Sequence, residues 1–196
     1  MKSSCTSYAV AVVTLGLLVG AVPAMAQAPA GQTISLAAAI QRGYNGVKQN
    51  LTEMATKMPE GDYGFKPGPA PEMRTYGQLF AHVANAQFNF CSAAKGVANP
   101  RQGQNLEQTL KTKADVVKAL ADSFAFCDDA YSGLTDQNAG EMVKQGQNTI
   151  ARAGLLANNV SHNNEMYGTG AVYMRAKGLV PPSTERAAAA RAAAKK

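Results

Sequence analysis

Two histidines are the residues of this chain best suited to chemistry. His82 and His162 are the only histidines in the sequence, and each lies in a segment whose apolar residues recur every three to four positions. Met166 follows His162 by four residues, which places both on one face of a helix. His82 follows Leu79 by three and falls at the edge of an apolar face. Chemistry that needs both imidazoles therefore requires these two segments to pack together.

Other catalytic patterns are missing from the sequence. It contains no nucleophile elbow, no glycine loop of the phosphate-binding type and no closely spaced pair of inward carboxylates. It also has no Cys-x-x-Cys-His motif for covalent haem attachment. Asp128 and Asp129 follow Cys127 on a predicted helix and are interpreted as part of a solvated face. The candidate chemistry thus rests on the two histidines.

Four segments have the periodicity of amphipathic helices, and they would position the histidines. A capping-box pattern, Thr75 with Gln78, marks the start of the second helix, and Thr112 is the expected cap of the third. The predicted helices span roughly residues 35–58, 75–95, 113–132 and 149–177. Long crossing loops are predicted at residues 60–72, 96–103 and 133–147, the last with some extended backbone. This pattern predicts an all-α protein, a four-helix bundle.

The two ends of the chain differ from this bundle in composition. Residues 1–26 have the form of a signal peptide: Lys2, an apolar stretch, and a small-x-small pattern that predicts cleavage before Gln27. The mature protein is then expected to be periplasmic or secreted, with no stable membrane insertion. Residues 27–182 form the predicted domain, and residues 183–196 are predicted to be a basic, alanine-rich flexible tail. Export also favours a disulfide between Cys91 and Cys127, the two mature cysteines, over two separate buried thiols.

The charge of the chain argues against nucleic-acid binding. Of the formal net charge of +6, Lys2 and the C-terminal tail carry most, so the bundle itself has only about +2. No arginine-rich stripe with interleaved aromatic residues is present in it. We therefore expect no nucleic-acid partner, while a small-molecule ligand and a homodimer through an exposed apolar face both stay open.

Four stretches of the mature chain carry motifs that are specific in combination. They are MPEGDYGFKP at residues 58–67, YGQLFAHV at 76–83, HNNEMYG at 162–168 and YMRAKGLVPP at 173–182. Together they resemble the DinB superfamily over nearly the whole mature chain. The resemblance implies a four-helix bundle of the DinB or YfiT type, which agrees with the helical periodicity.

The resemblance also implies a divalent metal, zinc or nickel, held by three histidines. One comes from the second helix, where His82 matches, and two from a His-x-x-x-His turn of the fourth, where His162 matches the first. The third position is Met166, whose thioether is a poor zinc ligand. Glu165 could instead supply an oxygen, giving two histidines and one glutamate. The predicted metal site is therefore His82 and His162 with Glu165 or Met166.

Two functions follow from this pattern. The first is an exported DinB-like protein with a divalent-metal pocket, acting as a metal-dependent transferase or a hydrolase-like enzyme. The second is a noncatalytic binding or structural bundle whose metal site has decayed through Met166, with His82 and His162 as core histidines that share hydrogen bonds. Export argues against transferases that consume cytoplasmic low-molecular-weight thiols, because these cosubstrates are scarce outside the cytoplasm.

Overall fold

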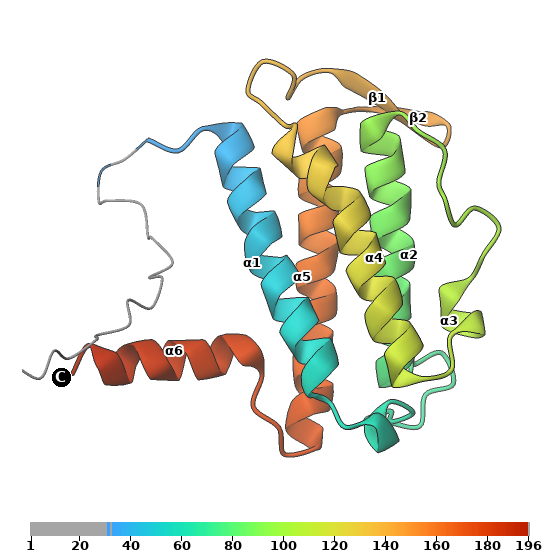
Figure 1. Cartoon of the computed structure of the whole chain (residues 1–196), viewed down its shortest axis with the longest axis vertical. Coiled ribbons are helices and arrows are strands. Elements are labelled where there is room, and N and C mark those ends of the chain that lie inside the picture. Colours follow the sequence, from blue (N-terminus) through green and yellow to red (C-terminus); the bar gives the residue numbers. More distant parts are fainter. Residues whose placement is uncertain (1–30, 32, 196) are drawn as a thin grey trace, which may run out of the picture. The chain divides into compact units, whose positions relative to one another are not determined.

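Four long helices packed side by side make up the body of the structure (Figure 1). They are α1 (Leu36–Lys57), α2 (Tyr76–Lys95), α4 (Lys113–Ser132) and α5 (Arg152–Ala176). This computed structural model describes Gly31 and residues 33–195, and the residues from Ile34 onward form one compact unit. The predicted signal peptide, residues 1–26, and its cleavage site lie outside the described residues. The predicted all-α four-helix bundle is confirmed.

Side-chain caps fix where the helices begin. The Ser35 hydroxyl accepts from the backbone of Ala38 at the start of α1. Thr75 and Gln78 form the predicted capping box at the start of α2, and Thr112 caps α4 as expected. Gly96 ends α2 with φ of 66°, a left-handed conformation that glycine adopts without a steric penalty. These local signals set the ends of the helices to within a few residues.

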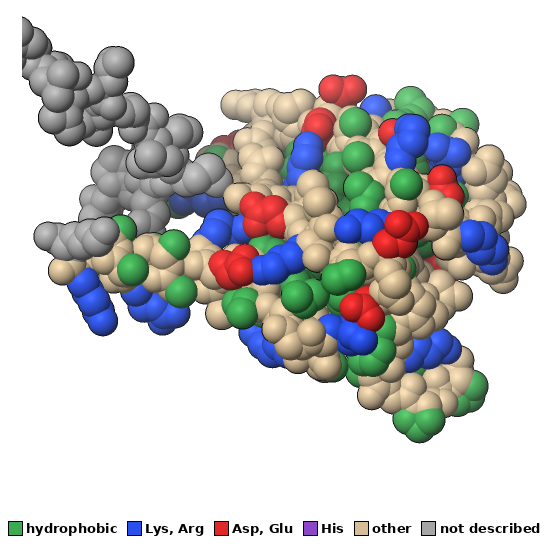
Figure 2. All heavy atoms as spheres, turned by 60° about the horizontal axis from the view of Figure 1, so that its bottom comes forward, with side chains coloured by type: hydrophobic (Ala, Val, Ile, Leu, Met, Phe, Trp, Pro, Cys, Tyr) green, Lys and Arg blue, Asp and Glu red, His purple; other side chains and the backbone are tan. Residues whose placement is uncertain are grey.

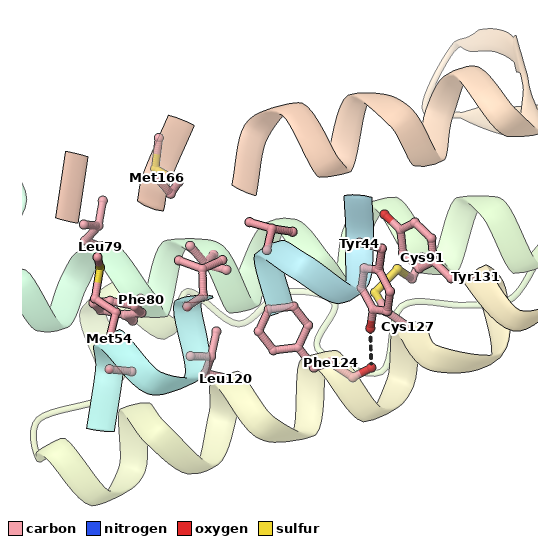
Figure 3. Packing of buried hydrophobic residues seen from close by; sticks show 14 of the residues in the cluster. Tyr44, Met54, Leu79, Phe80, Cys91, Leu120, Phe124, Cys127, Tyr131 and Met166 are labelled. Atoms are coloured by element: carbon pink, nitrogen blue, oxygen red, sulfur yellow. Dashed lines mark hydrogen bonds between the residues drawn. A yellow bond between two sulfur atoms is a disulfide. The ribbon is translucent and has the colours of Figure 1, made fainter. Parts of the chain in front are cut away.

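The core runs through the space between the four helices. Figure 3 shows Met54 and Phe80 at one end of it, Leu120 in the middle and the aromatic pair Tyr44 and Tyr131 at the other. The rings of this pair are stacked with their centroids 3.7 Å apart. Both tyrosines are 2% exposed, so most of their surface is removed from water. The bundle is thus held together mainly by apolar and aromatic packing.

The connections contain local structure, of which the sequence predicted only the extended backbone before the fourth helix. A 3-10 turn, η1 (Glu60–Asp62), lies in the first crossing loop, and a four-residue helix, α3 (Leu106–Thr109), precedes α4. Before α5 the chain forms an antiparallel hairpin, β1 (Met142–Gln145) with β2 (Asn148–Ala151), which pairs Met142 with Ala151. The prediction that the fourth helix begins near residue 149 was therefore wrong by about one turn, because these residues pair in the hairpin.

The C-terminal segment also differs from the prediction. Residues 183–196 were expected to be flexible, but Pro182–Ala193 form a helix, α6, that leaves the bundle near the end of α5 (Figure 1). Alanine has the highest helix propensity, and proline suits the first position of a helix. Ion pairs from Arg186 to Glu53 and from Lys57 to Glu185 attach the first turn to α1. In α6 only Pro182 is buried. The helix is therefore stabilised by its alanine content and by ion pairs to α1, not by an apolar face packed on the bundle.

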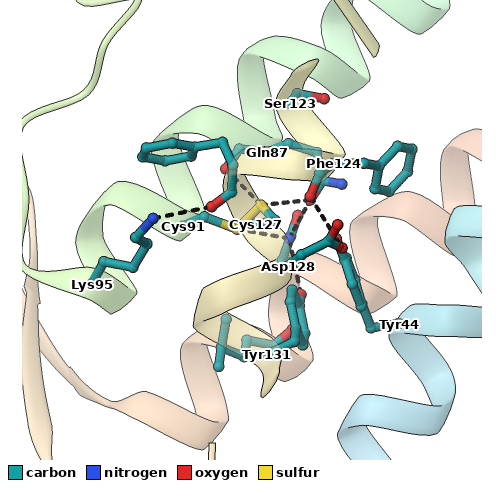
Figure 4. Close-up of a disulfide and its surroundings, with 12 residues drawn as sticks. Tyr44, Gln87, Cys91, Lys95, Ser123, Phe124, Cys127, Asp128 and Tyr131 are labelled. Carbon is teal, nitrogen blue, oxygen red and sulfur yellow. Dashed lines mark hydrogen bonds between the residues drawn. A yellow bond between two sulfur atoms is a disulfide. The ribbon is translucent and has the colours of Figure 1, made fainter. Parts of the chain in front are cut away.

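A disulfide joins α2 to α4. Cys91 and Cys127 are bonded, as predicted, and both are completely buried (Figure 4). The bond closes a loop across 36 positions of the sequence.

Among the helices in the described part of the chain, none combines the length and the apolar character needed to cross a bilayer.

Candidate metal-binding site

The two histidines meet between α2 and α5. Their Nε2 atoms lie 3.1 Å apart and their ring centroids 5.1 Å apart. Both side chains are half-buried. The ring of Phe90 on α2 packs against His162, with the centroids separated by 6.2 Å. The packing of α2 against α5 thus brings together two imidazoles that are eighty positions apart in the sequence.

A carboxylate on α3 orients His82. Glu107 places Oε1 2.7 Å from Nδ1 of His82 and Oε2 2.7 Å from Nε of Arg74. Partial burial acts to raise the pKa of Glu107, but the hydrogen bonds from Arg74 and His82 outweigh it and hold this pKa below its ordinary value. The ionised carboxylate can only accept, so Nδ1 of His82 carries the hydrogen and Nε2 carries the lone pair.

A chain of buried amides orients His162 in the same sense. The hydroxyl of Tyr131 donates to the carbonyl of Leu156, so it must accept from Nδ2 of Asn159. Oδ1 of Asn159 then accepts from Nδ2 of Asn163, which turns Oδ1 of Asn163 toward Nδ1 of His162 at 3.4 Å. Both asparagines are 0% exposed. This polarity places the hydrogen of His162 on Nδ1 and its lone pair on Nε2.

Two nitrogen lone pairs therefore face each other across 3.1 Å. This arrangement is repulsive unless a cation, either a proton or a metal ion, lies between the nitrogens. For a metal–nitrogen distance of about 2.05 Å, this separation subtends an angle of about 98° at the metal, between octahedral and tetrahedral values. Burial lowers the pKa of His162 and outweighs the hydrogen bond to Asn163 and the carboxylate of Glu165, which both act to raise it. A neutral His162 can ligate a metal ion or accept a hydrogen bond from a protonated His82.

The other two predicted ligands lie beside this pair. Glu165 is exposed, and Met166 is buried at 8% exposure. Both line a groove of about 460 Å³ that also contains Arg74, Leu79 and Tyr173. Within the described residues, no three or more histidine, cysteine, aspartate or glutamate side chains are placed to hold one metal ion. The structure therefore brings His82 and His162 together and leaves Glu165 at the rim of the groove.

Sequence reasoning missed three residues of this site. Glu107 lies in a helix of four residues, which is too short to give a periodic signal. Asn159 and Asn163 were missed because the inward face of the fourth helix was predicted from His162 and Met166. In the structure His162 is half-buried, and the buried stripe of α5 is Asn159, Asn163, Met166, Gly170 and Tyr173. Hydropathy does not identify asparagine as a core residue, so the two amides looked like solvent-facing positions.

One protein-family model covers most of the bundle. The model of the DinB superfamily matches residues 44–169, which include both histidines and the bundle between them. The chain belongs to the DinB superfamily. The DinB resemblance of its motifs is thereby confirmed.

Solved structures show the same DinB fold at low sequence identity. A DinB-like protein from Bacillus cereus ATCC 10987 has a TM-score of 0.61 and 17% identity, over 73% of this chain and 93% of its own. A conserved protein from Enterococcus faecalis has a TM-score of 0.59 and 12% identity, over 74% of this chain and 98% of its own. A DinB-like protein from Bacillus subtilis has a TM-score of 0.55 and 18% identity, over 71% of this chain and 92% of its own. Comparison with curated protein sequences found no significant match.

Proposed function

We propose that this DinB protein binds a divalent metal ion, zinc or nickel, through Nε2 of His82 and Nε2 of His162. The observation that carries the proposal is the 3.1 Å separation of the two Nε2 atoms, with Nδ1 of each ring facing a side-chain oxygen. A histidine that ligates a metal usually donates its second N–H to a carboxylate or carbonyl, as His82 does to Glu107. The donor set fits a divalent ion held by two imidazoles with further positions open.

The third protein ligand in this proposal is Glu165. It lies three residues after His162, so its side chain starts on the same side of α5. A carboxylate with two imidazoles is a known zinc donor set, whereas the thioether of Met166 is weak and its side chain is buried in the core. A bound metal of this type supplies an activated water or thiolate at neutral pH. The chain's own contribution is to keep Nδ1 of His82 protonated through Glu107.

The groove beside the histidines is the proposed site for a small-molecule ligand. It is bounded by Met73, Leu79, Val172 and Tyr173, which supply apolar surface, while Arg74 supplies a charge next to Glu107. A molecule seated there would lie one helical turn from His82 and His162. This placement supports a metal-dependent transferase or hydrolase-like activity.

Export and the absence of a nucleic-acid partner belong to the same proposal. The disulfide between Cys91 and Cys127 supports an oxidising compartment, periplasmic or extracellular. On the face drawn in Figure 2, acidic and basic side chains are interspersed, which argues against a nucleic-acid groove on that face. Pairing of two copies stays a prediction.

A second candidate is a noncatalytic bundle in which a proton bridges the two histidines. The burial of Met166 at the position of the missing imidazole favours this alternative. In such a protein the groove would bind a ligand without metal chemistry, or the histidines would only stabilise the contact between α2 and α5.

Metal analysis separates the two candidates. The protein is purified without a histidine tag, and bound metal per chain is measured for the wild type, His162→Ala and Met166→His. We expect one zinc or nickel per chain in the wild type, its loss in His162→Ala, and tighter binding in Met166→His, which completes three imidazoles. A wild-type protein that stays metal-free after incubation with excess zinc and nickel would refute the metal proposal and favour the proton-bridged pair.

A further inference from the structure

A second cleft begins one helical turn after His82 along α2, and it shares Glu107 with the proposed metal site. Its volume is about 680 Å³, within the usual range for small-molecule sites. It is formed by α2 and by the segment that leads from Gly96 to α3. Its lining is unusual in its number of carboxamide side chains. These are Asn85, Asn89, Asn99, Gln102, Gln104 and Asn105.

Hydrogen bonds within the protein engage the side-chain oxygen, Oδ1, of three of these amides. Oδ1 of Asn85 accepts from the backbone of Leu106, and Oδ1 of Asn105 accepts from the backbone of Glu107. Oδ1 of Asn89 accepts from the side chain of Asn99 at 2.5 Å. Among the described residues, the NH₂ groups of Asn85, Asn89 and Asn105 have no hydrogen-bond partner. The cleft therefore offers donors whose acceptor atoms are already occupied.

A buried hydroxyl on the cleft wall also lacks a partner. Ser92 is only 5% exposed, and its Oγ has no hydrogen bond among the described residues. It follows Asn85 by seven positions and Asn89 by three, so all three project from one face of α2 toward the cleft. A buried hydroxyl without a partner costs free energy, which a bound ligand would recover once the Ser92 side chain turns its Oγ from its closed-off position toward the cleft. This is an observation independent of the amides.

One cation completes the cleft. The guanidinium of Arg101 lies over the ring of Phe88, 5.6 Å from its centroid. It forms only long contacts, an ion pair with Asp122 at 3.7 Å and a hydrogen bond to Oε1 of Gln104 at 3.5 Å, which a ligand carboxylate can replace. The second charged residue of the cleft, Glu107, has both oxygens engaged by His82 and Arg74. Arg101 is thus placed to bind a carboxylate through paired N–H donors.

We propose that this cleft binds a small hydroxylated carboxylate, such as a sugar acid. The ligand's carboxylate pairs with Arg101, and its hydroxyl oxygens accept from the amides of Asn85, Asn89 and Asn105. The hydroxyl of Ser92, after a rotation of its side chain toward the cleft, gains its missing partner from the same molecule. The volume admits one or two sugar units. Binding does not require the metal proposed at His82 and His162.

The test is a titration of the tag-free full-length chain, after treatment with a chelator, with D-glucuronate as the probe. Binding is followed by calorimetry and by amide chemical shifts. We expect saturable binding with a Kd in the range of about 0.1–10 mM, and shifts concentrated on residues 85–107. D-Glucose, which has hydroxyls but no carboxylate, should bind at least about tenfold more weakly. Sulfate should displace glucuronate only at much higher concentration.

Three variants locate the site. Arg101→Gln should weaken glucuronate binding about tenfold or more, because it removes a charge-assisted contact. Ser92→Ala should weaken binding by a few-fold while leaving the melting temperature unchanged or higher, because its hydroxyl has no partner in the free protein. Arg42→Gln, which removes an equal charge at an exposed position of α1, is the matched control and should leave binding unchanged.

Several results would overturn the proposal. Absence of saturation at about 50 mM glucuronate, a concentration well above the expected Kd, is one of them. Equal affinity for glucose would remove the role of the carboxylate, and equal displacement by sulfate would reduce the cleft to a general anion site. Equal losses in Arg101→Gln and Arg42→Gln would show that overall charge is responsible. A requirement for zinc or nickel would move the ligand to the metal site.

Discussion

Replacing Glu107 by Gln tests how the histidine pair is built. The substitution keeps the shape of the side chain and removes its charge. The carboxylate now accepts from Nδ1 of His82 and from Nε of Arg74, each at 2.7 Å. An amide has only one oxygen, so its NH₂ group must face one of these two donors. The variant therefore either loses the bond that orients His82 or loses the bond to Arg74.

The size of the effect follows from the contacts that are lost. A hydrogen bond to a charged group contributes about 1.5–3 kcal/mol, and outer-shell partners of metal-binding histidines typically change metal affinity about 10–100-fold. The side chain of Glu107 is 21% exposed, so water replaces part of the lost interaction. We therefore expect zinc affinity to fall by about tenfold, at the lower end of that range.

Two measurements check this expectation. Competition with a chromophoric chelator gives zinc affinity, and nitrogen-15 NMR of the metal-free protein gives the tautomer of each histidine. The wild type should show the hydrogen of His82 on Nδ1, and Glu107→Gln should shift part of the population to Nε2. Glu72→Gln removes an exposed carboxylate from the rim of the groove and serves as the control. Unchanged affinity together with an unchanged tautomer in Glu107→Gln would refute the orienting role.

Three further predictions concern stability. Gly170→Ala should destabilise the fold by about 1 kcal/mol in urea, because its Cβ would lie 2.6 Å from Sδ of Met54, whereas Gly168→Ala meets nothing within 4 Å and should stabilise it by about 0.5–1 kcal/mol. Replacing both Cys91 and Cys127 by Ala should lower the free energy of unfolding by about 4 kcal/mol through loop entropy, measured by urea unfolding. A loss below about 1 kcal/mol would contradict a stabilising role of the disulfide. Burial raises the pKa of four tyrosines far above the ordinary value, and that of Tyr173 less, so the folded state retains the protons of these four where the unfolded chain loses them. These tyrosines are Tyr44, Tyr63, Tyr76 and Tyr131. Their contribution is fully present below about pH 10 and is lost as the pH rises further, by up to about 1.4 kcal/mol per pH unit for each tyrosine, which urea titrations from pH 8 to 11.5 can measure. Constant stability over that range would contradict the burial of the hydroxyls.

The helices and their caps could be predicted because their signals are local. Thr75 and Gln78 are three residues apart and satisfy each other's backbone donors, so the pattern that predicts the helix start is also the structure that forms it. The start of α5 could not be placed in this way. Residues 148–151 pair with a strand that precedes them, and such pairing depends on the hairpin as a whole. The conformation of α6 was missed because its contacts to α1 are ion pairs, which leave no apolar stripe in the sequence.

The histidine pair was predicted from residue type and helical spacing, yet its chemistry depends on groups that this reasoning excluded from the core. Asn163 is adjacent to His162 in the sequence and is fully buried, and it is Asn163 that determines which nitrogen of His162 bears the lone pair. Asn163 is itself oriented by Asn159, whose Nδ2 lies 2.9 Å from the hydroxyl of Tyr131 and 3.8 Å from Sγ of Cys91. The amides therefore connect the surroundings of the disulfide to the proposed metal ligands. A substitution near the disulfide can change which nitrogen of His162 carries the hydrogen without contacting either histidine. The reason is that Tyr131 orients Asn159, Asn159 orients Asn163, and Asn163 orients His162.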